Sequence, residues 1–80
     1  MNAKAMIAAA AAGKTAFRSS GNLIANLAFT RHTNGTYVYM DVGNGVFVTV
    51  DRVEAVADNE ILGWADDAPV LTIKTEEWFV

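Results

Sequence analysis

Cysteine is absent from this 80-residue chain, and histidine and proline occur once each. Without cysteine, neither a disulfide framework nor a thiolate metal site is available. A chain of this length forms a single domain, residues 1–80, that buries roughly 60 to 65 % of its unfolded surface. So small a core leaves little room for a deep active-site cleft. We therefore expect a globular domain that binds rather than catalyses, is not an enzyme and takes no cofactor.

Long apolar segments are also missing. The longest run, residues 5–12, has eight residues, far fewer than the roughly 20 that span a bilayer. It is mostly alanine, which is weakly hydrophobic for the core of a secretory signal. We therefore expect no membrane partner and no secretion, so that the sequon Asn34-Gly35-Thr36 matters only for its turn chemistry.

Acidic residues are absent from the first half of the chain. Residues 1–40 carry four basic side chains and a net charge of +4, whereas residues 41–80 carry nine acidic and two basic side chains and a net charge of −7. In so small a domain we expect most of the acids to share one connected surface. Such a surface attracts basic partners and repels nucleic acid, so direct nucleic-acid binding is not expected.

The N-terminal residues predict a helix over 2–12. Asn2 is a suitable N-cap, and the alanine run has the highest intrinsic helix propensity. Gly13 stands where a helix C-terminus favours glycine. The small side chains of this helix would allow it to pack closely on a sheet.

From residue 23 onward the apolar period changes to two, which is typical of a half-buried strand over 23–30. Asn34-Gly35 is the strongest short signal for a two-residue hairpin turn. With that turn, Phe29 pairs with Met40 in the next strand. The apolar residues of the two strands then share one face.

A second hairpin follows at residues 43–45. A three-residue loop there pairs Met40 with Val48 and gives one continuous apolar face, so we predict that loop length. The same register places a second group of side chains on the opposite face, namely Tyr37, Tyr39, Asp41, Phe47, Thr49 and Asp51.

Beyond Asp51 the pattern is less regular. Residues 52–57 either extend the preceding strand or form a helical turn. Strands are predicted at 61–65 and 70–75, with a turn at 66–69 between them. The tail that contains Trp78 and Phe79 is expected to dock on the edge of the core. The predicted fold class is therefore α+β, with an N-terminal helix packed on a four- to five-stranded antiparallel β-sheet, a meander.

Catalytic and metal-binding motifs are incomplete. Gly13-Lys14-Thr15 resembles the end of a phosphate-binding loop, but Ala8 stands where the first glycine belongs and no strand precedes it. His32 and the serines at 19 and 20 lack a nucleophile elbow. The acid pairs at 66–67 and 76–77 do not have the spacing of a calcium loop. We predict no catalytic, cofactor or metal site.

A protein-binding surface is the better prediction, because aromatic side chains interleaved with acids are typical of interfaces. An alternative stays open, in which the segment around Phe17 or the pair Trp78-Phe79 covers the aromatic face as a second small core. The candidate partner-binding residues are six acids and three aromatics: Asp51, Glu54, Asp58, Glu60, Asp66, Asp67, Tyr37, Tyr39 and Phe47.

In overall style the chain resembles the small phage-encoded anti-CRISPR proteins that block bacterial defence. The shared features are a length of 80 residues, the lack of cysteine and of catalytic motifs, the α+β pattern, the alanine-rich start at 8–12 and the acidic stretch 51–77. The resemblance implies an inhibitor in the cytoplasm of an infected bacterial host. It would bind the basic groove of a type I CRISPR surveillance complex and block target DNA binding.

A different class of function also fits the sequence. A small structural or assembly protein, virion-associated or oligomer-forming, would use exposed strand edges and an alanine-faced helix for self-association. A soluble monomer or weak dimer is what we expect of the inhibitor, whereas a stable closed oligomer would indicate the assembly protein.

Overall fold

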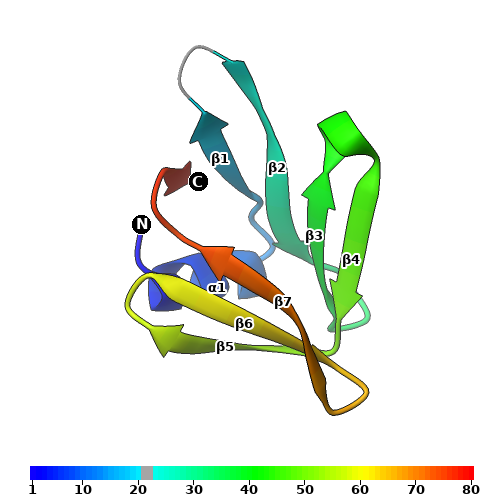
Figure 1. The fold of residues 1–80 in the computed structure, drawn as a ribbon. Coiled ribbons are helices and arrows are strands. Elements are labelled where there is room, and N and C mark those ends of the chain that lie inside the picture. Colours follow the sequence, from blue (N-terminus) through cyan, green and yellow to red (C-terminus); the bar gives the residue numbers. More distant parts are fainter. Residues whose placement is uncertain (21–22) are drawn as a thin grey trace.

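The structure is a computed structural model that describes residues 1–20 and 23–80. Figure 1 shows the helix and strands of these residues. Their bounds are α1 (Ala3–Ala11), β1 (Ala16–Ser20), β2 (Leu23–Arg31), β3 (Tyr37–Asp41), a 3₁₀ turn (Val42–Asn44), β4 (Val46–Val50), β5 (Arg52–Ala57), β6 (Glu60–Ala65), β7 (Ala68–Lys74) and β8 (Trp78–Phe79).

The predicted N-terminal helix is confirmed as α1. The Asn2 side chain caps it by accepting a hydrogen bond of 2.7 Å from the Ala5 N–H. At the other end Gly13 adopts φ +87° and donates its N–H to the Ala10 carbonyl at 3.0 Å. Glycine suits this left-handed position because it has no Cβ to clash with the backbone. Met6, Ala10 and Ala3 are fully buried on the inner side of the helix.

The strands form two antiparallel sheets, which confirms the predicted α+β meander. The first sheet has five strands in the order β4-β3-β2-β1-β8, and the second has three in the order β5-β6-β7. The sequence pattern did not predict β1, which pairs with β2 on one side and with β8 on the other.

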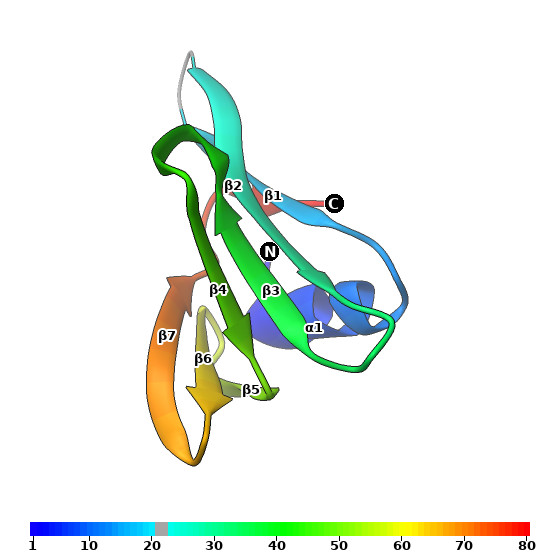
Figure 2. The same ribbon diagram turned by 90° about the vertical axis from the view of Figure 1, so that its right-hand side faces the viewer.

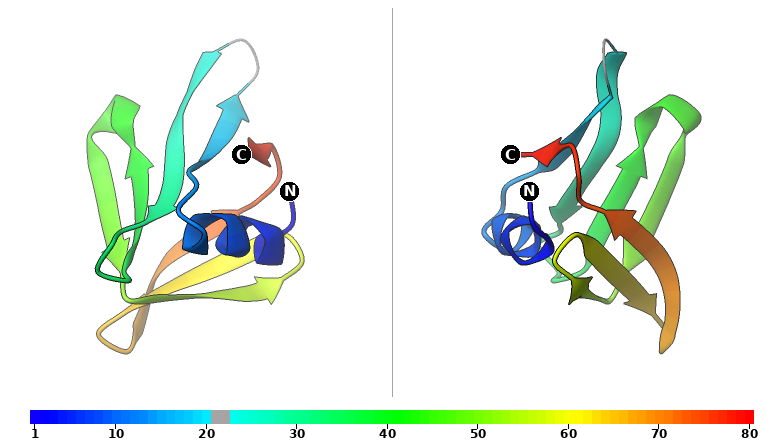
Figure 3. Two further views of the ribbon diagram at one scale, coloured as in Figure 1. Left: turned by 180° about the vertical axis from the view of Figure 1, so that it is seen from behind. Right: turned by 60° about the vertical axis from the view of Figure 1, so that its left-hand side comes forward.

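The two sheets are joined by two direct passages of the chain. β4 continues into β5 through Asp51, whose N–H donates to the Trp64 carbonyl at 2.7 Å, and β7 leads into β8 through residues 75–77. β8 pairs with β1, so the chain returns from the second sheet to the edge of the first (Figures 1 and 3). The helix contacts β1, β2 and β5.

The core lies between the two sheets and α1. Phe29 from β2 is its largest fully buried side chain, and Ile61 and Ile73 come from the second sheet. The complete buried cluster is Ala3, Met6, Ala10, Ala16, Phe29, Ile61, Ile73 and Trp78.

The predicted register of the first hairpin is wrong by one residue. Phe29 pairs with Tyr39 and not with Met40. Cross-strand partners point to the same face of a sheet, so Tyr39 and Tyr37 face the core beside Phe29. Met40 and Val38, which were predicted to face inward, lie on the opposite face.

The cause lies in the turn chemistry. The loop has three residues, because the His32 N–H donates to the Thr36 carbonyl at 2.8 Å and Gly35 takes the left-handed position at φ +91°. The Asn34 side chain accepts from the N–H of Thr36 at 3.1 Å. It therefore closes a local turn of its own and does not occupy the two-residue turn that was predicted.

The second hairpin loop is also one residue longer than predicted. The Asp41 carboxylate accepts hydrogen bonds from the backbone N–H of Asn44 at 3.3 Å and from its side-chain amide at 2.8 Å. These bonds hold the 3₁₀ turn, so β3 pairs with β4 through Met40 and Phe47 rather than Met40 and Val48. The two errors cancel for β4, whose side chains point to the faces that were predicted. Only the side chains of β3 point to the opposite faces. Val42, predicted to face inward, is 62 % exposed.

The later segments follow the prediction more closely. Residues 52–57 form a strand, β5, rather than a helical turn, and Ile73 of β7 faces the core as expected. Pro69, expected in the turn, lies within β7. Trp78 does more than dock at an edge, since it is 4 % exposed and belongs to the core.

Candidate functional site

One face of the first sheet lies away from α1 and from the second sheet. Figure 2 shows β4, β3, β2 and β1 side by side, with the helix behind them and β5 to β7 below. We call the face that lies away from α1 the open face. Among the side chains that the structure describes, the strand registers place these on it: Phe17, Ala28, Thr30, Val38, Met40, Phe47, Thr49 and Phe79.

Five of these residues stand directly opposite one another across all five strands. The order is Phe79, Phe17, Ala28, Met40 and Phe47, which we call the aromatic row. Phe47 is 66 % exposed, Phe79 50 % and Phe17 41 %. The rings of Phe17 and Phe79 are neighbours, with centroids 6.1 Å apart. Three phenylalanines thus present their rings to solvent in one line.

The open face carries no acidic or basic side chain among its described residues. Threonine supplies its polar groups, and the Thr30 hydroxyl donates to the Lys14 carbonyl at 3.2 Å. A surface of this kind can bury apolar area against a partner.

The predicted grouping of Tyr37 and Tyr39 with Phe47 is wrong. Both tyrosines lie on the inner face, where the ring of Tyr37 stacks on Phe29 with centroids 5.7 Å apart and the ring of Tyr39 lies 6.4 Å from that of Trp78. Burial first, and then the nearby Asp41 carboxylate, raise the pKa of the Tyr39 hydroxyl above its ordinary value. Of the three predicted aromatic anchors, only Phe47 is on the open face.

Three predicted acids come together at one end of the second sheet. Asp66 and Asp67 form the two-residue turn between β6 and β7 with φ of +51° and +64°, and the Asp51 carboxylate accepts from the Asp66 N–H at 3.1 Å. Positive φ at both positions is the geometry of a type I′ turn, which aspartate tolerates better than most residues.

The other predicted acids lie elsewhere. Asp58 is at the far end of β5, about 20 Å from Asp51 by the rise of an extended strand. Glu54 is 3.9 Å from Arg52, and Glu60 pairs with Lys74 at 3.1 Å. The acids therefore occupy both ends of the second sheet, with ion pairs between them, and do not form the single connected patch that was predicted.

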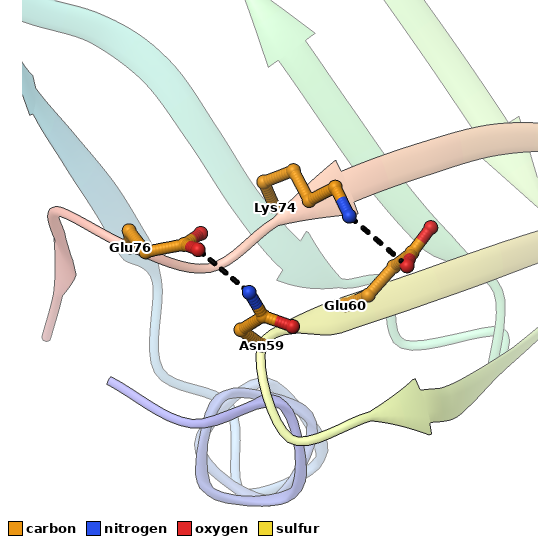
Figure 4. A network of polar contacts seen from close by, with 4 residues as sticks. All are labelled: Asn59, Glu60, Lys74 and Glu76. Atoms are coloured by element: carbon orange, nitrogen blue, oxygen red, sulfur yellow. Dashed lines mark hydrogen bonds and ion pairs between the residues drawn. The ribbon is translucent and has the colours of Figure 1, made fainter.

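A polar network links the turn after β5 to the end of β7 (Figure 4). The Asn59 side-chain amide donates to the Glu76 carboxylate at 2.6 Å, beside the ion pair of Lys74 with Glu60. Hydrogen bonds from its own backbone N–H and from Asn59 lower the pKa of Glu76, which is fully exposed. This network ties the second sheet to the segment that precedes β8.

A cleft of about 320 Å³ lies between the inner side of the first sheet and β7. Its volume is at the lower limit of ligand sites, which begin at about 300 Å³. Trp78, one of its lining residues, is only 4 % exposed, and Arg18 and Glu77, which also line the cleft, lie 3.5 Å apart. The lining residues are Arg18, Leu27, Tyr39, Thr72, Ile73, Lys74, Glu76, Glu77 and Trp78.

Within residues 1–20 and 23–80, no three histidine or acidic side chains come close enough together to hold a metal ion. His32 is exposed in the first hairpin loop. The side chains of residues 19–26, including Ser19 and Ser20, lie outside the described residues. In the part of the chain that the structure covers, no helix is long and apolar enough to cross a membrane.

The sequence reasoning missed Phe17, Met40 and Phe79 as surface residues. A usable signal exists for Phe79, because adjacent residues in a strand point to opposite faces. Once the tail is read as a strand, Trp78 and Phe79 cannot both be buried on the same side. Phe17 and Met40 depend on the pairing of β1 with β2 and on the length of the first hairpin loop.

Comparison of the chain with protein-family models, with curated proteins and with solved structures finds no match. Functional inference therefore depends on the geometry of this chain.

Proposed function

We propose that this protein is a non-enzymatic protein-binding domain that docks on its partner through the open face. The exposed aromatic row supports this proposal. Burial of apolar surface contributes roughly 25 cal/mol per Å², and contiguous apolar patches on small soluble domains are typical of interaction sites. Aromatic side chains are also the residues that most often anchor protein interfaces.

The proposed partner is a nucleic-acid-handling host complex, in line with the resemblance to anti-CRISPR proteins. A type I CRISPR surveillance complex in the cytoplasm of an infected bacterium is our specific hypothesis. The open face would supply the apolar anchor. The cluster of Asp51, Asp66 and Asp67 would face basic groups that otherwise bind the DNA backbone.

The test is competition between this protein and target DNA for a purified type I surveillance complex. Phe47→Ser should weaken inhibition at least about tenfold, because a buried phenylalanine anchor contributes about 2 kcal/mol or more. The matched control is Val70→Ser on the second sheet, which removes a side chain that is 50 % exposed and should leave inhibition unchanged. Equal inhibition by Phe47→Ser and the original protein would refute the open face as the docking surface.

The acidic cluster is tested separately by the double variant Asp66→Asn, Asp67→Asn. If those carboxylates meet basic groups, the variant should associate more slowly at low salt and show a flatter salt dependence. Loss of inhibition in this variant, with full inhibition by Phe47→Ser, would move the docking surface to the second sheet.

A second candidate function is the structural or assembly protein. The observation in its favour is that β4 and β7 stand at sheet edges, and unpaired strand edges can add strands from other chains. Light scattering that shows a stable closed oligomer would support this function over the inhibitor.

A further inference from the structure

We propose that Asn34 is a site of self-modification, at which the backbone nitrogen of Gly35 converts the Asn34 carboxamide into a carboxylate. The chain contains two Asn-Gly pairs, Asn34-Gly35 and Asn44-Gly45. Both asparagines are exposed in hairpin loops, and both glycines have positive φ, +91° and +68°. The surroundings of the two pairs differ, and they favour the reaction at Asn34 over Asn44.

The reaction is an intramolecular acyl transfer. The Gly35 nitrogen attacks Cγ of Asn34, and the new N–Cγ bond replaces the bond from Cγ to Nδ2. The Gly35 amide proton and the side-chain amide group leave together as ammonia. Water then opens the cyclic imide at either of its carbonyl carbons, which gives aspartate or isoaspartate. Either product adds one negative charge to a chain whose net charge is −3.

The side chain of Asn34 is folded toward its nucleophile. Its Oδ1 accepts from the N–H of Thr36, two residues further along, at 3.1 Å, and this bond closes a ring that encloses the Gly35 nitrogen. The Asn44 side chain is directed backward along the chain, because its Nδ2 donates to the Asp41 carboxylate at 2.8 Å. The carboxamide of Asn44 must therefore give up that bond and turn before the following glycine can attack it.

Two donors hold the oxygen that becomes negative during the attack. Oδ1 of Asn34 accepts from the Thr36 N–H at 3.1 Å and from the Thr36 hydroxyl at 2.8 Å. Donors about 2.7 to 3.1 Å from a developing oxyanion are the means by which enzymes stabilise acyl transfer. Hydrogen bonds to a charged oxygen are roughly twice as strong as those to a neutral one. The two bonds therefore stabilise the transition state more than the starting amide.

Charge favours the same site. A Cβ atom built on Gly35 would lie 3.4 Å from a terminal nitrogen of Arg31, so the guanidinium lies beside the attacking residue. A positive charge there stabilises the negative charge that passes from the nitrogen to the carboxamide oxygen. At Asn44 the neighbouring charge is the Asp41 carboxylate, which has the opposite effect.

Both attacking N–H groups are held within their turns. The Gly35 N–H donates to the His32 carbonyl at 3.0 Å. The Gly45 N–H donates to the Val42 carbonyl at 3.3 Å. This bond must open at either site before the nitrogen can attack, so it slows both reactions and does not reverse their order.

Incubation of the folded protein at neutral pH in water enriched in heavy oxygen tests the proposal, because the imide takes its new oxygen from water. Peptide mapping by mass spectrometry then gives the conversion rates of Asn34 and Asn44 in the same sample, with Asn34→Asp as the standard for the product. We expect Asn34 to convert at least about tenfold faster. One oxyanion donor contributes about 10²- to 10³-fold in an enzyme site closed to water, and this loop is exposed.

Unfolding and two variants show whether the loop geometry causes the difference. In concentrated urea the two rates should become similar, because the unfolded chain keeps both Asn-Gly pairs but not their surroundings. Thr36→Val removes the hydroxyl donor and should slow Asn34 about fivefold, the factor for one hydrogen bond of about 1 kcal/mol. Arg31→Met should slow Asn34 about fourfold, the factor for unit charges about 5 Å apart in water. Neither variant should change the rate at Asn44, and circular dichroism checks that both are folded.

Equal rates at the two asparagines of the folded protein, or faster conversion of Asn44, would overturn the proposal. It would also be overturned if neither variant lowered the rate at Asn34, since the donors and the guanidinium would then have no part in the reaction. A rate ratio that stays the same in urea would assign the difference to the sequence alone and would equally refute the role of the loop.

Discussion

Gly63→Ala tests a close approach between the two sheets. Gly63 lies in β6, and a Cβ atom placed there would be 2.9 Å from Cγ1 of Val50 and 3.2 Å from Cβ of Leu71. Val50 is fully buried in β4, and a β-branched side chain in a strand has few alternative rotamers. Neither neighbour can move away cheaply, so the added methyl group should strain the passage from β4 to the second sheet.

Two effects of opposite sign decide how much Gly63→Ala changes the free energy of unfolding. Replacing a glycine within a strand by alanine gains roughly 0.5 to 1 kcal/mol, because the unfolded chain loses conformational freedom. Overpacking a rigid core site costs typically 1 to 3 kcal/mol. The contacts at Gly63 are with the two Cγ atoms of Val50, a buried and stiff side chain, and with the Cβ atom of Leu71. Because none of these atoms ends a long flexible side chain, overpacking should win. We expect a net loss of about 1 to 2 kcal/mol and a fall in Tm of roughly 5 to 15 °C.

Urea and thermal unfolding followed by circular dichroism measure this loss. The companion variants are Val50→Ala and the double variant Gly63→Ala, Val50→Ala. Removing the Val50 methyl groups makes room for the new Cβ, so the double variant should be more stable than the sum of the two single losses predicts. Unchanged stability of Gly63→Ala, or strict additivity in the double variant, would refute the close crossing of β4 and β6.

Two further predictions concern the segment between β7 and β8. Glu77 has φ +68° and an exposed contact of 3.5 Å with Arg18. Relief of the left-handed strain should outweigh the loss of that weak pair, so Glu77→Gly should raise the free energy of unfolding by up to about 1 kcal/mol. A lower free energy of unfolding for Glu77→Gly in urea titration would contradict this prediction. The pKa of Glu76 is lowered by hydrogen bonds from its own N–H and from Asn59, so its contribution to stability is complete above the ordinary glutamate pKa of about 4.3 and is lost as the pH falls through the lowered value. The stability difference between the original protein and Glu76→Gln should therefore be constant near neutral pH and shrink on acidification, and a difference that does not vary from pH 7 to pH 3 would argue against the network.

Local signals in the sequence determined several elements correctly. The cap at Asn2, the alanine run and Gly13 define α1 almost to the residue. Alternation of apolar residues placed Phe29 and Val50 on the core side of β2 and β4. These features depend on neighbours in the chain, which sequence patterns report directly.

The orientation of β3 depended on two loop lengths, each misjudged by one residue. Asn34 and Asp41 both use their side chains to hold the backbone of the loop that follows, an interaction that competes with a tight turn. A slip of one residue moves every side chain of a strand to the other face. The predicted binding surface was therefore composed of residues from both faces of the sheet.

The acidic half of the chain shows a different limit of sequence reasoning. The number of carboxylates in this half follows directly from the sequence. Their positions in space depend on which end of a strand each acid occupies. Asp51 meets Asp66 because β5 and β6 are partners, while Asp58 lies at the other end of the same pair. Net charge predicts attraction to basic partners but not the shape of a charged patch.

The pairing of β1 with β8 has a consequence for how the chain folds. It joins Phe17 to Phe79, residues that are far apart in the chain, and such distant pairings form slowly. During synthesis, β1 cannot pair with β8 until β8 has left the ribosome. Until then, the position that Trp78 occupies in the hydrophobic core stays empty. Truncation of the final strand should therefore yield a chain that collapses without completing its native structure.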